Sequence, residues 1–324
     1  MATDDKKSYL PAQSKKWSGR VDGTTRPYFR WHQLIECINL DDISKFPQAV
    51  VFLGFCCDEG IRRNHGRIGA KDAPDDLRNV LAKLPVNFHE NLFLFDAGDV
   101  FCYNNNLELA QSELADRVSQ ILRYGGFPVL FGGGHEVTYA HFQGIKNAFD
   151  KSIGIINIDA HLDIREIVDG QGNSGTSFYQ IAEETKSRGK PFHYLALGIQ
   201  DISNTQALFD YADQNGVQII RASEIINRNL EAIIVQIQEF GKKVDQIYLT
   251  IDLDAFTASY APGVSSPAFN GIIPGRTFQK LFSAIIHLPN LISVDIAELN
   301  PVLDIDQRTT KLAADMIFKI IQKF

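Results

Sequence analysis

Short apolar runs alternate along this chain with longer amphipathic stretches, and this alternation constrains the fold more than any other feature. The runs are rich in β-branched and aromatic residues and are bounded by Gly, Asp or Asn, which is typical of buried strands. About eight strands are predicted, at residues 49–55, 92–95, 128–131, 153–158, 194–197, 217–220, 246–251 and 291–296. Amphipathic helices are predicted at residues 107–122, 231–240, 277–286 and 310–321. Strands that alternate with helices indicate a parallel sheet in an α/β fold.

The domain organisation follows from the absence of any internal boundary. The chain has 324 residues, and neither an internal repeat nor a low-complexity linker divides it. We therefore expect one doubly wound domain over residues 1–324, in which residues 1–45 form a polar N-terminal leader. In open parallel sheets, ligands bind beyond the carboxyl ends of the strands. Functional residues are accordingly expected directly after the apolar runs.

Composition and charge exclude several classes of function. The net charge of −7 argues against nucleic acid or an anionic membrane as the main partner. No apolar run approaches the roughly 18 residues of a spanning helix, and the first residues lack the apolar core of a secretory signal. We expect a cytoplasmic protein that binds a small molecule. The cysteines form no CxxC pair and are predicted to be reduced core residues: Cys37, Cys56, Cys57 and Cys102.

Two predicted strands lead into histidine and aspartate side chains. After the run 128–131, three glycines let the backbone turn sharply, so that His135 faces the strand ends. This signal is weak alone, although the segment lacks the spacing of a phosphate-binding loop. After Ile158, an extended backbone would place Asp159, His161 and Asp163 on one face. The alternative is a solvated turn, but such a cluster directly after an apolar strand favours a bound cation, which would offset the carboxylate repulsion.

A third strand end carries Asp252 and Asp254, after the run 246–251. One aspartate there could cap a helix, but two that share a face indicate metal. Four carboxylates and two imidazoles without a thiolate suit manganese better than structural zinc. Six ligands exceed the need of one ion, so two ions are predicted, about 3.5–4 Å apart, bridged by Asp159 and Asp252 and activating a water for hydrolysis. The predicted ligands are His135, Asp159, His161, Asp163, Asp252 and Asp254.

Three segments in order give the chain a family resemblance: FGGGHEVTYAHFQG (131–144), IINIDAHLD (155–163) and DLDAFTASYAPGVSSPAFNG (252–271). They resemble the signatures of the ureohydrolases, the family of arginase, agmatinase and formimidoylglutamase. The resemblance implies a three-layer arginase-like fold with an eight-stranded parallel sheet flanked by helices, and a homo-oligomer, either a trimer or a hexamer. It also implies two Mn²⁺ ions per subunit. One ion would be held by His135, Asp159, Asp163 and Asp252, and the other by Asp159, His161, Asp252 and Asp254.

Other segments resemble the formimidoylglutamase branch of that family. Arginases and agmatinases usually carry a proton-shuttling histidine near the position of Ser174, and residues 173–176 contain none. The resemblance implies Mn-dependent hydrolysis of N-formimidoyl-L-glutamate to L-glutamate and formamide, a step of histidine degradation. The segments are WSGRVDG (17–23), RWHQ (30–33), GIRRNHGRIGAKDAPDDLR (60–78), GNSGTSFYQ (172–180) and FHYLALGIQDISNTQALF (192–209).

Two catalytic acids are implied by the same resemblance. Glu298 follows the last predicted strand and matches the family glutamate that orients the cationic end of the substrate by charge-assisted hydrogen bonds. The alternative is a capping or surface acid. Asp163 would take the proton from the bridging water and pass it to the leaving nitrogen.

The two carboxylates of the substrate require polar partners. Arginine suits carboxylates because its planar fork donates two parallel hydrogen bonds. The candidate arginines all lie in the loop 60–67, where solvated surface charge is the alternative reading: Arg62, Arg63 and Arg67. The candidate neutral partners are Asn173, Ser174 and Thr176. His65 is a candidate to replace the missing shuttle histidine, with a surface histidine as the alternative.

Two rival functions remain at this stage. Another ureohydrolase could act on agmatine, arginine or a guanidino acid, but a cationic tail would be repelled by the arginines of the loop 60–67. The second rival is a catalytically silent binding protein of the same fold, which the complete ligand set disfavours.

Overall fold

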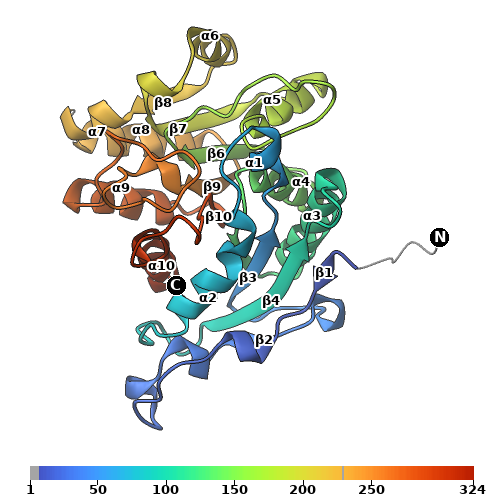
Figure 1. Ribbon diagram of the computed structural model, residues 1–324, viewed down its shortest axis with the longest axis vertical. Helices are drawn as coiled ribbons and strands as arrows, with labels where there is room; N and C mark the ends of the chain where they lie inside the picture. The colour runs from blue at the N-terminus through green and yellow to red at the C-terminus, as the bar shows by residue number, and fades with distance from the viewer. Residues whose placement is uncertain (1–6, 228–229) are drawn as a thin grey trace.

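Eight parallel strands form the body of a twisted sheet in the computed structural model, which describes residues 7–227 and 230–324 (Figure 1). Two short strands extend it, so that the strand order is β1-β4-β3-β5-β10-β9-β6-β7-β8, with β2 also paired with β4. The eight are β3 (Ala49–Cys56), β4 (Phe93–Phe101), β5 (Phe127–Phe131), β6 (Ile153–Ile158), β7 (His193–Ile199), β8 (Gln218–Arg221), β9 (Gln246–Asp252) and β10 (Leu291–Ala297).

All eight predicted runs are strands of this sheet, and the predicted α/β fold is confirmed. The two additional strands are β1 (Tyr9–Leu10), antiparallel to β4, and β2 (Glu36–Cys37), parallel to it. Each spans two residues. Neither is marked by an apolar run, because so short a strand has no periodicity that a sequence pattern can reveal.

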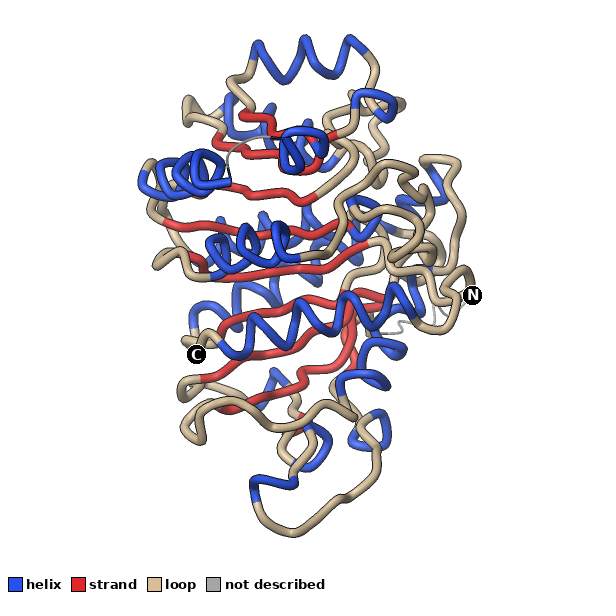
Figure 2. Tube along the Cα trace, turned by 90° about the vertical axis from the view of Figure 1, so that its left-hand side faces the viewer, coloured by secondary structure: helices blue, strands red, loops and turns tan. Residues whose placement is uncertain are grey.

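Helices cover both faces of the sheet, and Figure 2 shows the strands stacked between them. One face packs against α2 (Ala73–Leu81), α7 (Ala222–Asn227), α8 (Leu230–Lys242), α9 (Arg276–Ile286) and α10 (Arg308–Gln322). The other packs against α3 (Leu107–Arg123), α4 (Val137–Ala148), α5 (Ser177–Ser187) and α6 (Gln206–Gln214). The short helix α1 (Glu59–Arg63) follows β3. No described helix is long and apolar enough to cross a membrane.

The side chains of β3 show why its sequence is apolar throughout. Val50 and Phe52 belong to the core on one face of the sheet, whereas Val51 and Leu53 belong to the core on the other. A strand that is buried on both faces needs a continuous apolar run in place of an alternating one. The same logic accounts for the uniformly buried pattern of β5 and β9.

The N-terminal segment packs along the β3 and β4 side of the sheet. Although this segment is mostly polar, Trp17 and Trp31 are buried, and their rings stack on Phe52 with centroids 6.2 and 6.1 Å away. The indole nitrogen of Trp17 donates to Asp96 on β4 at 2.6 Å. Residues of the expected leader therefore contribute to the core beside β3.

The strand order decides where the polar residues meet. Strands β5, β10, β9 and β6 are consecutive neighbours in the sheet, and all four are parallel. Their carboxyl ends consequently lie side by side at one edge. The ends of these four strands and the loops that leave them carry every predicted metal ligand and Glu298.

Candidate metal centre

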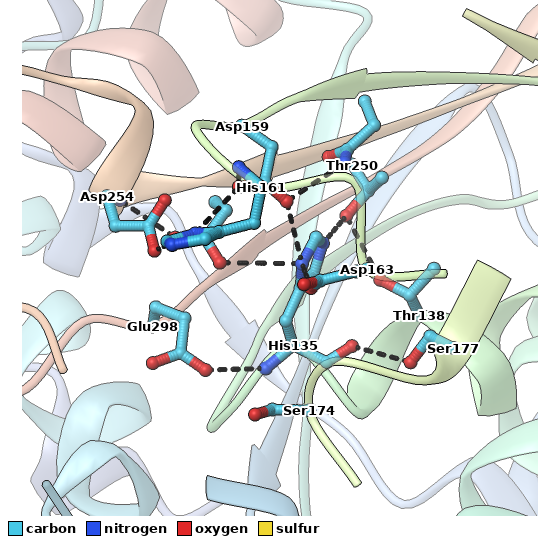
Figure 3. Close-up of polar contacts among 12 residues, drawn as sticks. His135, Thr138, Asp159, His161, Asp163, Ser174, Ser177, Thr250, Asp254 and Glu298 are labelled. Atoms are coloured by element: carbon cyan, nitrogen blue, oxygen red, sulfur yellow. Dashed lines mark hydrogen bonds and ion pairs between the residues drawn. The ribbon is translucent and has the colours of Figure 1, made fainter. Parts of the chain in front are cut away.

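His135 and three carboxylates form the first of two ligand groups (Figure 3). Nδ1 of His135 lies 2.8 Å from Oδ2 of Asp163, 3.2 Å from Oδ2 of Asp159 and 3.4 Å from Oδ2 of Asp252. The four ligand atoms lie within 4.8 Å of one another. Four donors converging at these distances surround a space that suits one cation.

His161 belongs to the second group, together with Asp159 and Asp254. Its Nδ1 lies 2.9 Å from Oδ2 of Asp254 and 3.6 Å from Oδ1 of Asp159. Asp159 takes part in both groups, which is the geometry expected of a bridging ligand. Asp252 has a ligand atom close to those of the first group only. Its contact with a second ion therefore stays a prediction from the family resemblance.

The glycine loop before His135 is held between two strand ends. Gly132 lies against the end of β10 and Gly133 against the end of β3, where a Cβ on Gly133 would lie 1.6 Å from the carbonyl oxygen of Cys57. The loop is pinned on both sides by backbone hydrogen bonds, from Gly134 N to Cys57 O at 3.1 Å and from Glu298 N to Gly133 O at 2.8 Å. Glycine is required at position 133 because no side chain fits there.

Thr250 orients the ring of His135 through Nε2, the ring nitrogen that faces away from the carboxylates. Nε2 of His135 lies 2.9 Å from the Thr250 hydroxyl, which donates its proton to Oδ1 of the buried Asp295 at 2.6 Å. Since the hydroxyl has one proton, it accepts from Nε2 of the histidine. This tautomer leaves the lone pair of Nδ1 directed toward the carboxylates, as a metal ligand requires.

Asp159 is also fixed by its surroundings, and Asp163 follows it on the same turn. Asn157 donates to Oδ2 of Asp159 at 3.0 Å, and the backbone N–H of His161 donates to Oδ1 at 2.7 Å. Strand β6 ends at Ile158, so these ligands do not lie on a continued strand, and Asp163 has a φ of +49°. The convergence of the side chains is therefore achieved by a turn and not by extended alternation.

The electrostatics of the centre reflect an excess of buried negative charge. Burial, together with the charges of Asp254 and Asp159, raises the pKa of Asp252 well above its usual range. Burial likewise raises the pKa of Asp254 to about 6. The charge of Asp254 raises the pKa of His161 to about 12. So many carboxylates in a buried site favour any positive charge placed among them.

Glu298 lies beside the first group and is held in a strained backbone conformation. Its φ is +66°, and its Oε1 accepts the backbone N–H of His135 at 2.9 Å. Burial and the nearby Glu136 raise the pKa of Glu298 well above its usual range. Strain of this kind persists where the surrounding structure imposes it, and it concentrates at functional sites.

A pocket of about 330 Å³ opens onto the ligands. Five of the residues predicted to contact the substrate or transfer protons line it: His65, Arg67, Asp163, Ser174 and Glu298. Four further lining residues with polar side chains were missed by the sequence patterns: Asn64, Arg165, Ser265 and Ser266. Arg165 has a signal, because it stands two residues after Asp163 and continues the same alternation.

Four of the predicted contacts lie outside this pocket. Arg62 and Arg63 both donate to Glu59, at 2.6 and 2.9 Å, and Arg63 also pairs with Glu108 at 2.6 Å. Their positive charge is thus already balanced. Asn173 and Thr176 bond to each other across a turn, with Asn173 N donating to the Thr176 hydroxyl at 2.8 Å.

Comparison with known proteins identifies the family. The sequence profile of the arginase family matches residues 48–322. The chain belongs to the arginase family. Among curated relatives, the formimidoylglutamase of Psychrobacter cryohalolentis is 41% identical over 345 residues, and that of Geobacillus thermodenitrificans is 40% identical over 320 residues; each alignment covers 98% of both chains. The formiminoglutamase of Trypanosoma cruzi, solved with Mn²⁺, aligns with a TM-score of 0.74 at 30% identity, covering 85% of this chain and 93% of that one.

Proposed function

We propose that this arginase-family protein hydrolyses N-formimidoyl-L-glutamate to L-glutamate and formamide. The observation that carries the proposal is the pocket itself, which has buried acids at its floor and arginines at its rim. The substrate has the matching charges, with a cationic formamidinium group at one end and two carboxylates at the other. Relatives named formimidoylglutamase, 40% identical or more over 98% of both chains, support the same reaction.

We propose further that two Mn²⁺ ions per subunit bind in the two ligand groups. The donor set supports this, because carboxylate oxygens and imidazole nitrogens without a thiolate suit Mn²⁺. The shared Asp159 supports a pair of adjacent ions. Such a pair supplies hydroxide near neutral pH by lowering the pKa of a water held between the ions. The proposed ligands are His135, Asp159, His161, Asp163, Asp252 and Asp254.

Glu298 is proposed to bind the formamidinium group. It lines the pocket, it is buried, and one of its oxygens is fixed by the backbone of His135. The other oxygen can accept from an N–H of the planar cation, which directs the amidine carbon toward the ligand groups. Burial strengthens this attraction, since a charge pair in a site shielded from water is weakly screened.

Asp163 is proposed to carry the proton. It is the most exposed acid of the first group, with 13% of its side chain accessible, and it lines the pocket. Its Oδ2 lies 2.8 Å from Nδ1 of His135, so the carboxylate belongs both to the first ligand group and to the pocket floor. From there the carboxylate can accept a proton from the attacking water and return it to the leaving nitrogen.

The reaction is tested by measuring product release from the Mn-loaded protein. Formamide released from formimidoylglutamate, with no urea released from agmatine or arginine, is the expected result. Urea from a guanidino compound without formamide from formimidoylglutamate would establish the rival ureohydrolase function. A protein inactive on every amidine and guanidine tested would be a silent binding protein of the same fold.

Location and assembly are proposed from the family resemblance. We expect a cytoplasmic enzyme that assembles into a homo-oligomer, either a trimer or a hexamer. Light scattering after size-exclusion chromatography measures the mass of the particle against the 324-residue chain. A monomer at micromolar concentration would contradict the proposed assembly.

A further inference from the structure

The pocket over the ligand groups separates its charges. Its floor presents the carboxylates of Asp163, Asp252, Asp254 and Glu298. Its rim presents two guanidinium groups, those of Arg67 and Arg165, and both residues are exposed. A molecule that carries a cation at one end and carboxylates at the other matches this order.

The guanidinium of Arg165, unlike those of Arg62 and Arg63, bonds to a neutral side chain. Among residues 7–227 and 230–324, no carboxylate lies within ion-pairing distance of its guanidinium; Nη1 donates instead to the neutral Oδ1 of Asn64 at 2.8 Å. Arg62 and Arg63, by contrast, share the carboxylate of Glu59. The charge of Arg165 is therefore available to an anion in the pocket.

Asn64 holds Arg165 in place. Its amide oxygen accepts from Arg165, while its amide nitrogen donates to the hydroxyl of Ser174 at 3.0 Å. The backbone N–H of Arg165 donates to the carbonyl of Gly175 at 3.0 Å. The loop between β6 and α5 and the segment after α1 thus meet beside Arg165. The hydrogen bond to Asn64 restrains Nη1 of the guanidinium and leaves Nε and Nη2 to donate to a ligand. This restraint reduces the conformational entropy that the Arg165 side chain loses when a carboxylate binds.

Arg67 faces the pocket from a different loop. Its Nε donates to Ser265 O at 2.8 Å and its Nη2 to Val264 O at 2.7 Å. Both acceptors are neutral backbone carbonyls, so the guanidinium keeps its charge while its position is fixed. The rim therefore offers two separately supported cations, a suitable arrangement for two carboxylates.

We propose that Arg165, positioned by Asn64, binds one carboxylate of the substrate and selects amidines with an acidic tail, while Arg67 receives the second carboxylate. This inference rests on the proposed function and assigns the part of the site that determines specificity. A tail that ends in an ammonium group, as in agmatine, would be repelled by the same rim.

The test compares Arg165→Ala with wild type on two substrates. The first is N-formimidoyl-L-glutamate and the second is formamidine, which has the reacting group without the tail. A charge-assisted hydrogen bond contributes about 1.5–3 kcal/mol, so kcat/KM for formimidoylglutamate should fall on the order of 10- to 100-fold, chiefly through KM. Turnover of formamidine should be unchanged. Arg62→Ala is the matched control, because Arg62 is also an exposed arginine but lies outside the pocket and is paired with Glu59.

Two results would overturn the inference while leaving the reaction intact. One is an unchanged KM for formimidoylglutamate in Arg165→Ala, and the other is an equal loss on both substrates. Binding of L-glutamate to the Mn-loaded protein, measured by calorimetry, decides the matter independently of turnover. Weaker binding in Arg165→Ala than in wild type supports the inference even if formimidoylglutamate is not hydrolysed, and equal or undetectable binding by both proteins contradicts it.

The role of Asn64 is tested by a double-mutant cycle. Asn64→Ala should raise KM for formimidoylglutamate with little change in kcat, because it releases Arg165 without removing its charge. In the Arg165→Ala background the same change should have no further effect on KM. Additive effects on KM would show that Asn64 acts on the substrate or the fold by another route and would contradict the positioning role.

Discussion

The hydroxyl of Thr250 lies 2.9 Å from Nε2 of His135, at the opposite end of the ring from the nitrogen that faces the carboxylates. The Thr250 hydroxyl donates a hydrogen bond to Asp295, which also accepts hydrogen bonds from Tyr248 and His141. A buried acid on β10 therefore fixes the tautomer of a proposed metal ligand through one intervening hydroxyl. Partners behind a ligating histidine set its orientation and basicity.

Thr250→Val should weaken Mn²⁺ binding without unfolding the protein. Valine keeps the shape of threonine but cannot accept from Nε2, so the Nδ1 lone pair is no longer favoured. Loss of such a partner typically reduces metal affinity about 10- to 100-fold. Metal titration followed by calorimetry measures the effect, and Thr250→Ser, which retains the hydroxyl, is the control. Equal affinity in the two variants would exclude the role of the hydroxyl.

Removing Asp159 should have a larger effect on metal content than removing Asp254. Asp159 belongs to both ligand groups, whereas Asp254 belongs to one. We expect Asp159→Ala to retain fewer ions per subunit than Asp254→Ala after dialysis, as measured by elemental analysis. Asp252→Ala should also abolish activity with loss of metal, and near-normal turnover there would refute its proposed bridging role. Asp213→Ala, an exposed position on α6, should keep the full metal content.

The sequence predicts the position of the centre better than the outer part of the pocket. The ligands are predictable because each lies within a few residues of the end of an apolar run, and parallel strands bring their carboxyl ends to one edge. Which arginines are available to the substrate depends on the partners that the fold brings to each of them. Glu59 stands three and four residues before Arg62 and Arg63, a spacing that predicts ion pairs on a helix. The contact between Arg165 and Asn64, by contrast, joins segments 101 residues apart, and no local pattern reveals it.

Arg78 should be essential to stability. It is fully buried on α2 and donates to Asp96 at 2.7 Å and to Asp99 at 2.7 Å, both on β4. Arg78→Met would leave two buried carboxylates without this partner, and breaking such a network costs about 3–5 kcal/mol. Urea denaturation measures the free energy of unfolding. Lys242→Ala, which removes an exposed ion pair with Glu239, should leave it nearly unchanged; a similar loss in both variants would contradict a special role for the buried network.

The same network predicts how stability depends on pH. Burial tends to raise the pKa of Asp99, but the charges of Arg78 and Lys16 outweigh this and lower it below its usual range. The folded-state pKa is thus below the unfolded value of about 3.9. The stabilisation is fully present above the unfolded pKa and is lost as the pH falls through the folded one. The difference in unfolding free energy between wild type and Asp99→Asn should therefore shrink in acid. A difference that grows as the pH falls would show that folding raises the pKa of Asp99 instead of lowering it.

Glu298→Gln should impair catalysis while leaving the metal content intact. Glu298 is in neither ligand group, and a glutamine oxygen can still accept the backbone N–H of His135, so the local fold should persist. A bound formamidinium cation favours the charged form of Glu298 despite its raised pKa, and glutamine has no such form. Removing one such electrostatic contact commonly lowers the rate about 10²- to 10³-fold. Steady-state kinetics measures the catalytic effect, and elemental analysis measures the metal content. A near-normal kcat/KM would show that Glu298 has no catalytic role. A loss of Mn²⁺ in proportion to the loss of activity would show that Glu298 acts by holding the metal.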